Sequence, residues 1–120
     1  MDLYRERIIE LYKNPLNKGK IADPDLRSHA EVVSCGDKID LYVKLKDNRI
    51  SEIKFESHSC AISTASACLV TEYLKGKGVE ETKKITKEKV LELLGLDLSK
   101  NPTRLKCALL ILDALKLLKK

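Results

Sequence analysis

The feature of this sequence that most constrains its fold is a change in the spacing of apolar residues near the middle of the chain. Between Ile39 and Phe55, apolar and polar side chains alternate, which is the period of a strand with one buried face. After Ala61, apolar residues recur at helical spacing. Because a chain of 120 residues can bury one continuous core, the two halves predict a single compact α+β domain over residues 1–120.

Turn and cap residues divide this pattern into elements. The expected strands cover residues 29–34, 39–45 and 49–56, and they form a three-stranded antiparallel sheet with a hairpin turn at Asp47-Asn48. The expected helices cover residues 3–13, 61–75, 87–94 and about 103–115, with one helical turn at 80–84. Residues 16–26 carry Gly19 and Pro24 and little periodicity, so we expect a loop that is free to move.

Composition excludes several classes of function. The net charge is +5, but lysines and glutamates are interleaved along most of the chain, and aromatic residues make up only 4%. A solvated, salt-bridged surface is therefore expected rather than nucleic-acid binding. No stretch is apolar for long enough to span a bilayer, and the first residues lack a signal-peptide pattern. We expect a cytoplasmic protein that binds neither nucleic acid nor membranes.

Three of the four cysteines stand where chemistry is expected. Ser34-Cys35-Gly36-Asp37 forms a turn between two strands, and Gly36 allows a backbone conformation in which a thiolate and a carboxylate point to the same place. Cys60 and Cys107 fall where helices are expected to begin, and a helix N-terminus favours the thiolate form. We therefore expect Cys35, Asp37, Cys60 and Cys107 to converge on one metal site.

Three thiolates and one carboxylate suit zinc or ferrous iron, or an iron–sulfur cluster with one weaker, exchangeable ligand. Each cysteine also has a simpler interpretation as a buried apolar residue, which we favour for Cys68 in the middle of its helix. His58 either joins the ligands or lies on the surface at a strand end. Lys106 supports the site by attracting an anionic sulfur species, or it is merely solvated.

The motifs around these residues resemble the iron–sulfur cluster scaffold family of IscU, the NifU N-terminal domain and SufU. The resemblance extends over nearly the whole chain. Its motifs are Tyr12-Lys13-Asn14-Pro15-Leu16-Asn17-Lys18-Gly19, Cys35-Gly36-Asp37, Ser59-Cys60-Ala61-Ile62-Ser63-Thr64-Ala65-Ser66 and Arg104-Leu105-Lys106-Cys107-Ala108.

The resemblance implies a function as well as a fold. Its members accept persulfide sulfur from a cysteine desulfurase, combine it with iron into a labile [2Fe–2S] cluster, and pass the cluster to apoproteins. On that basis Cys35, Cys60 and Cys107 would be ligands and sulfur acceptors, and Asp37 would keep the cluster transferable. Zinc is an alternative occupant in the cluster-free form. The sequence leaves open whether a cluster is held by one subunit or by a homodimer.

Two departures keep a second function open. Lys106 stands where IscU proteins have a histidine. The zinc-dependent sulfurtransferase SufU also has a basic residue in place of that histidine. The interval from Gly76 to Cys107, however, has no room for the SufU insertion of roughly twenty residues. The expected function is a non-catalytic assembly scaffold, and the alternatives are a SufU-like sulfurtransferase, which also accepts sulfur from a desulfurase, and a structural or nucleic-acid-binding domain with incidental thiols.

Overall fold

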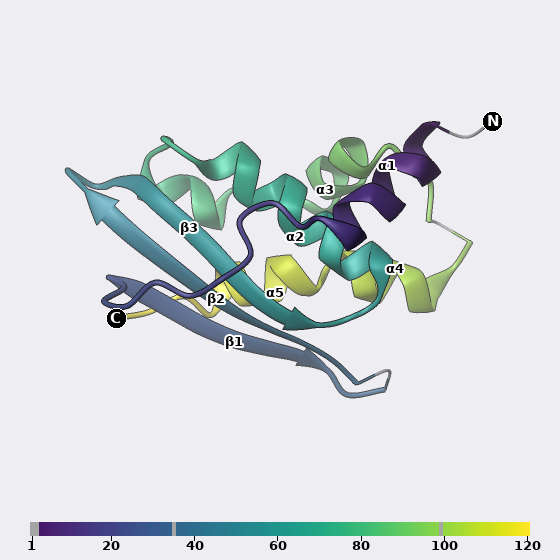
Figure 1. The fold of residues 1–120 in the computed structure, drawn as a ribbon, viewed down its shortest axis with the longest axis horizontal. Coiled ribbons are helices and arrows are strands. Elements are labelled where there is room, and N and C mark those ends of the chain that lie inside the picture. The colour runs from purple at the N-terminus through teal and green to yellow at the C-terminus, as the bar shows by residue number, and fades with distance from the viewer. Residues whose placement is uncertain (1–2, 35, 99) are drawn as a thin grey trace.

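The computed structural model describes residues 3–34, 36–98 and 100–120. Three strands form one antiparallel sheet in the order β1-β2-β3, and helices lie against one of its faces (Figure 1). The strands are β1 (Leu26–Val32), β2 (Asp37–Lys46) and β3 (Arg49–His58). The helices are α1 (Leu3–Lys13), α2 (Ala61–Leu74), the 3-10 turn η1 (Val79–Lys83), α3 (Lys87–Leu94), α4 (Pro102–Ala108) and α5 (Leu110–Lys116). The expected α+β architecture is confirmed.

Alternation along the central strand decides which face of the sheet is covered. In β2, Ile39, Leu41 and Val43 are buried, while the residues between them are more exposed. Asp47 and Asn48 both take positive φ, as a two-residue hairpin turn requires, and the hairpin pairs Lys38 with His58 at its far end. The start of β2 and the end of β3 therefore lie side by side.

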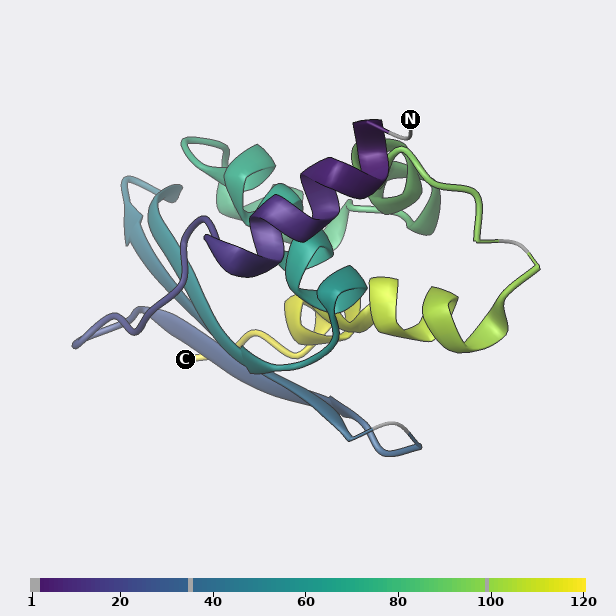
Figure 2. The ribbon, with the colours of Figure 1, turned by 45° about the vertical axis from the view of Figure 1, so that its right-hand side comes forward.

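Helix α2 is the centre of the helical layer. Every residue from Ile62 to Thr71 is buried, which is the pattern of a helix surrounded by protein on all sides. Its side chains at the first two turns are mostly Ala, Ser and Thr, which allow other elements to approach closely. Helix α1 packs along it above the sheet (Figure 2), and α3, α4, α5 and β3 also contact it.

Backbone segments cover both edges of the sheet. Along β3, the N–H of Phe55 donates to the carbonyl of Asn17 (3.0 Å) and the N–H of Gly19 donates to the carbonyl of Phe55 (2.8 Å). Along β1, Arg27 and Lys119 exchange two backbone hydrogen bonds of 2.9 and 3.2 Å. These bonds occupy the outward-facing backbone groups of Phe55 on β3 and of Arg27 on β1.

The segment expected to be a free loop is therefore fastened to the protein. Besides these backbone bonds, the side-chain amide of Asn17 donates to Thr71 Oγ1 (3.0 Å) and Glu72 Oε1 (3.2 Å) on α2. β1 also begins at Leu26, earlier than the expected His29, because its pairing with β2 continues to Val43. The partners of Asn17 and Gly19 lie more than thirty positions away in the sequence, so local pattern does not reveal them.

The last helix is divided in two. Helices α4 and α5 are separated at Leu109, which has φ −93° and ψ 0°. The expected caps elsewhere are confirmed: Thr86 Oγ1 accepts from the N–H of Lys89, and Gly95 ends α3 with φ 72°. The cap expected at Asp2 lies outside the described residues.

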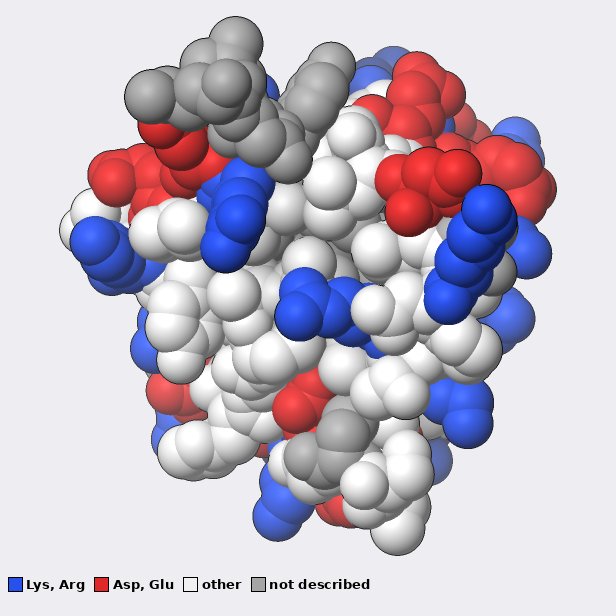
Figure 3. Space-filling view, turned by 90° about the vertical axis from the view of Figure 1, so that its right-hand side faces the viewer, with Lys and Arg blue, Asp and Glu red and all other residues white. Residues whose placement is uncertain are grey.

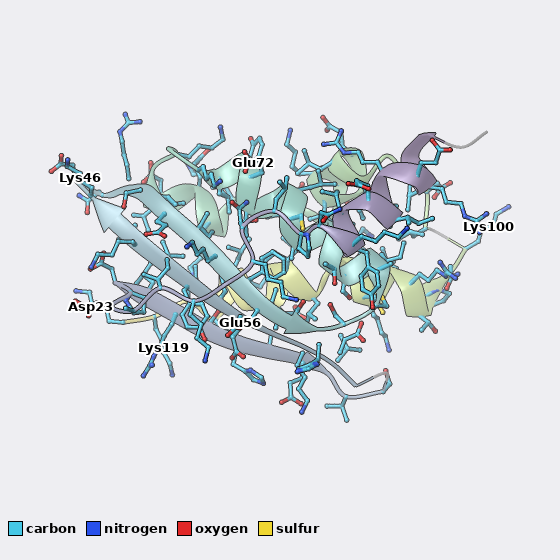
Figure 4. All side chains as sticks on the ribbon, in the orientation of Figure 1. Asp23, Lys46, Glu56, Glu72, Lys100 and Lys119 are labelled. Atoms are coloured by element: carbon cyan, nitrogen blue, oxygen red, sulfur yellow. The ribbon has the colours of Figure 1, made fainter. Side chains whose placement is uncertain are left out.

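The molecule is elongated, with its two ends built differently. Lys46, beside the β2–β3 turn, and Lys100, before α4, lie at opposite ends of the long axis (Figure 4). Helix α2 begins, and helix α4 lies, towards the end of the molecule opposite the β2–β3 turn (Figure 1). Among the described residues, no helix combines the length and apolarity needed to cross a membrane.

Candidate metal centre

Ligand atoms from three elements meet at the end of the molecule where α2 begins. Asp37, Cys60 and Cys107 each place one carboxylate oxygen or sulfur atom within 4.8 Å of the other two. They are contributed by the start of β2, the residue before α2, and the end of α4. The structure thus brings together three of the four ligands expected from the sequence.

The hairpin register places Asp37. Because Lys38 pairs with His58, the first residue of β2 lies across from the connection that leads to Cys60. Gly36 precedes it with φ +74°, the conformation expected of the turn, and its N–H donates to the carbonyl of Val32 (2.9 Å). Asp37 is only 7% exposed, so its carboxylate faces inward.

Cys60 is the N-cap of α2, as expected. Its backbone is extended (φ −71°, ψ 172°), and its carbonyl accepts from the N–H of Thr64 (3.0 Å). No side chain caps this helix start, so the free N–H groups and the positive end of the macrodipole lie beside the sulfur. The residue is exposed, so its sulfur is accessible to a reaction partner.

Cys107 does not lie at a helix start, and this expectation was wrong. It is the sixth of seven residues in α4, beyond the first turn with its free N–H groups, and it is 5% exposed. The helix begins at Pro102, and Asn101 Oδ1 accepts from the N–H of Arg104 (3.2 Å). Cys107 therefore joins the converging group without the activation that a helix N-terminus gives.

The remaining expected residues have different outcomes. Cys35 lies outside the described residues, so its part in the site stays a prediction; the neighbouring Gly36 is exposed. Lys106 is exposed beside Cys107, and His58 is exposed at the end of β3, outside the group of converging ligand atoms. Cys68 is fully buried in the core, as expected, where desolvation raises the pKa of its thiol to about 11.

Sequence reasoning missed the role of Ser63. Its hydroxyl lies 2.9 Å from Asp37 Oδ2 and 2.8 Å from the carbonyl oxygen of Cys107, and the thiol of Cys60 donates to it across 3.7 Å. The available signal was spacing: Ser63 follows Cys60 by three residues, which puts both on the same face of α2. One buried hydroxyl thus contacts all three converging residues.

The donor set fits a thiophilic metal. Around tetrahedral zinc with Zn–S distances of about 2.3 Å, ligand atoms lie roughly 3.8 Å apart. The three ligand atoms here all lie within 4.8 Å of one another. Two sulfurs and one carboxylate oxygen suit zinc or iron better than magnesium or calcium, which prefer oxygen alone. Figure 3 looks onto this end of the molecule, where uncharged residues cover much of the surface, with a basic side chain near the centre, an acidic one below it and further charges of both signs around the rim.

Comparison with known proteins shows the family. The model of the "NifU-like N terminal domain" matches residues 3–118, nearly the entire chain. The chain belongs to the NifU-like N-terminal domain family. Its predicted resemblance to iron–sulfur scaffold proteins is therefore confirmed.

Relatives of this NifU-like chain include both named functions. It is 40% identical over 114 residues to "Iron-sulfur cluster assembly scaffold protein IscU 1" of Archaeoglobus fulgidus, covering 95% of this chain and 72% of the relative. It is 35% identical over 129 residues to "Zinc-dependent sulfurtransferase SufU" of Bacillus subtilis, covering 95% of this chain and 87% of the relative. The second alignment is longer than the chain itself, so the relative carries residues that this chain lacks.

The fold of this NifU-like domain is shared by a solved structure. A putative iron–sulfur cluster assembly scaffold protein for the SUF system from Fervidobacterium islandicum is 28% identical to it, with a TM-score of 0.78 and coverage of 92% of both chains. The match supports the arrangement of sheet and helices that forms the site.

Proposed function

We propose that this chain is an assembly scaffold for a labile [2Fe–2S] cluster, which it builds and passes to apoproteins. The observation that carries the proposal is the convergence of Asp37, Cys60 and Cys107 at one end of the fold. Cys35 completes the set as the fourth ligand. A carboxylate among thiolates is suited to a cluster that must leave, because oxygen binds iron less firmly than sulfur does.

Sulfur arrives as persulfide from a cysteine desulfurase. A scaffold thiolate attacks the terminal sulfur of the donor persulfide, so that a new S–S bond forms, the donor's S–S bond breaks, and the donor leaves as a thiolate. Cys60 is exposed and stands at the N-terminus of α2, whereas Cys107 is buried, so Cys60 is the more accessible acceptor of the two. Two electrons per transferred sulfur, from a thiol or ferredoxin-class reductant, then yield sulfide for the cluster.

The second candidate is a SufU-like sulfurtransferase. Lys106 in place of the histidine of IscU, and the match to a zinc-dependent relative, support this alternative. In that case the same four residues would hold zinc, whose charge would favour the deprotonated form of the cysteines. The cysteine thiolates would accept the sulfur from the desulfurase.

Either proposed function implies a cellular location and a set of protein partners. A cytoplasmic location fits the thiols of Cys60 and Cys68, since cysteines stay reduced in such compartments. The partners are a cysteine desulfurase and, for the scaffold, apoproteins that accept the cluster. A homodimer that shares a cluster remains the alternative to a single subunit.

Anaerobic reconstitution separates the two candidates. The protein is purified without oxygen, its zinc and iron are measured, and Fe²⁺, cysteine, a thiol reductant and a catalytic amount of desulfurase are added while the visible spectrum is recorded. The scaffold gains a cluster chromophore that disappears when a chelator or an apoferredoxin is added.

Persistence of bound zinc with no chromophore would contradict the scaffold and support the sulfurtransferase. The matched control is Cys60→Ser, which should lose both the chromophore and the acceptance of ³⁵S from the desulfurase. Cys68→Ser is unsuitable here because it places a polar atom in the core; Cys68→Ala is the cysteine control that should behave as the parent does.

A further inference from the structure

We propose that Ser63 is a positioning residue of the metal centre, which holds Asp37 so that it binds metal through only one carboxylate oxygen. The inference rests on the proposed function, because it assumes that Asp37 is a ligand. It concerns the chain's own residues and applies to zinc, iron or a cluster alike.

The geometry around Ser63 carries the inference. Ser63 is 3% exposed, and its hydroxyl has one hydrogen with two acceptors in reach, Asp37 Oδ2 at 2.9 Å and the Cys107 carbonyl oxygen at 2.8 Å. An ionised carboxylate accepts a stronger hydrogen bond than a neutral carbonyl does. The hydrogen therefore favours Asp37 whenever its carboxylate is charged.

This hydrogen bond has a consequence for ligation. One carboxylate oxygen is occupied by the hydroxyl and is drawn towards α2, which leaves the other oxygen to face the metal. A carboxylate that binds through one oxygen is a weaker ligand than one that chelates, but it is already oriented and loses little rotamer freedom on binding. Ser63 thereby makes Asp37 both ready to bind and easy to displace.

A purely structural role is the competing interpretation, and α2 contains its control. Ser66, one turn further along, is 1% exposed and donates to the carbonyl oxygen of Ala108 at 2.6 Å. It joins α2 to α4 just as Ser63 does, but it has no hydrogen bond to a candidate ligand side chain. Replacing Ser66 thus removes the helix-to-helix bond without touching the site.

The test compares the metal affinities of the Ser63→Ala and Ser66→Ala variants. Zinc binding is measured by competition with a chromophoric chelator, and Co²⁺ is added as a spectroscopic probe of ligand number and geometry. Ser63→Ala should weaken zinc binding about tenfold or more, as is usual when a partner of a ligand is lost, and should change the intensity of the Co²⁺ ligand-field bands. Ser66→Ala should stay within about twofold and keep the parent spectrum.

A double-mutant cycle identifies the route of the effect. If Ser63 acts through Asp37, Ser63→Ala should have almost no further effect on zinc affinity in the Asp37→Ala background. Equal effects of Ser63→Ala and Ser66→Ala on zinc binding, or an undiminished effect in the Asp37→Ala background, would overturn the inference.

A measurement on the parent protein does not depend on the folding of any serine variant. The infrared difference between the zinc complexes of the parent and of Asp37→Ala reports the carboxylate stretches of Asp37. A widely separated pair of bands shows binding through one oxygen, whereas a narrowly separated pair shows chelation and overturns the inference. If the parent binds neither zinc nor Co²⁺, it is the proposed function that fails.

Discussion

A carboxylate that is almost covered by protein needs partners, and Asp37 has them. Its side chain is 7% exposed, with the hydroxyl of Ser63 at 2.9 Å and the ligand atoms of Cys60 and Cys107 within 4.8 Å. A charge in such a position is stabilised by hydrogen bonds or by a metal ion rather than by water. At the scale of single residues, the proposed site would combine strong sulfur ligands with one replaceable oxygen ligand.

Replacement of Asp37 by Ala should slow the loss of the cluster from the loaded scaffold. The reason is that the oxygen ligand marks the corner at which an incoming thiolate exchanges, and without it the three sulfur ligands leave that corner less accessible. The decay of the visible cluster absorbance after addition of an apoferredoxin measures the rate. Release as fast as that of the parent, or faster, would contradict the role given to Asp37.

The thiol of Cys68 should make the free energy of unfolding depend on pH in the alkaline range. Burial raises the pKa of its thiol from the ordinary value of 9.0 to about 11, so the protonated thiol is favoured in the folded state. Its contribution is complete below about pH 9, where the thiol is protonated whether the chain is folded or unfolded, and it is lost as pH rises to about 11. Over that window the free energy of unfolding should fall by about 2 kcal/mol more in the parent than in Cys68→Ala.

Urea titrations at several pH values between 8 and 11 provide the measurement. The difference between parent and variant removes the titration of lysines and tyrosines, which the two proteins share. Parallel curves would show that the Cys68 thiol is not desolvated. The same variant should bind zinc as the parent does, and a loss of metal would mean that Cys68 belongs to the site.

At the scale of elements, the C-terminal end of α5 is capped by the side chain of a lysine in another element. The ammonium group of Lys83, in η1, donates to the carbonyl oxygens of Leu115 (2.8 Å) and Lys116 (2.9 Å). The Leu115 carbonyl also accepts from the N–H of Leu118 (3.4 Å), and a cation at this end complements the helix macrodipole. The bond joins η1 to the helix that packs behind β1 and β2.

Lys83→Met should therefore lower the free energy of unfolding by about 1 kcal/mol, because it keeps the aliphatic length and removes the donor. The matched control is Lys84→Met. Lys84 is the next residue, and its ion pair with Glu81 (3.3 Å) is exposed to solvent. Such surface pairs contribute little, so the control should change stability by less than about 0.5 kcal/mol. If urea unfolding gave the same loss of stability for Lys83→Met and Lys84→Met, the cap on α5 would not stabilise the fold.

At the scale of the whole molecule, the site connects parts that are distant in sequence. Asp37 belongs to the sheet, Cys60 precedes the central helix, and Cys107 belongs to the helix that follows α3. A metal that binds all three can exist only on the folded chain, so its binding free energy adds to the stability of the fold. We propose that the chain unfolds as one cooperative domain, with or without metal.

Zinc at about a hundred times its dissociation constant should raise the melting temperature by about 10 °C, in a single transition. Calorimetry of the zinc-loaded and chelator-treated protein measures the shift. Cys60→Ala should abolish it, and Cys68→Ala should preserve it. Two separate transitions would contradict a single domain, and a shift retained in Cys60→Ala would place the zinc elsewhere.

Local pattern predicted the strands and caps because each of these depends on neighbouring residues. Alternation at Ile39 to Leu45 required a half-buried strand, and Thr86 and Gly95 specified the ends of α3 through hydrogen bonds within four residues. The position of Cys107 was predicted less well. Its distance from the helix start depends on whether Asn101 or a later residue caps α4, and several residues there are compatible with either.

The sequence by itself determined the α+β class, the hairpin, the site residues Asp37, Cys60 and Cys107, and the core position of Cys68, since periodicity and motif order are local properties of the chain. Only the tertiary structure decided that Asn17 and Gly19 hydrogen-bond to β3, that Lys83 caps α5, and that Ser63 contacts three candidate ligands at once. Apart from the contact between Ser63 and Cys60, these contacts join residues 26 to 44 positions apart, which no local pattern relates.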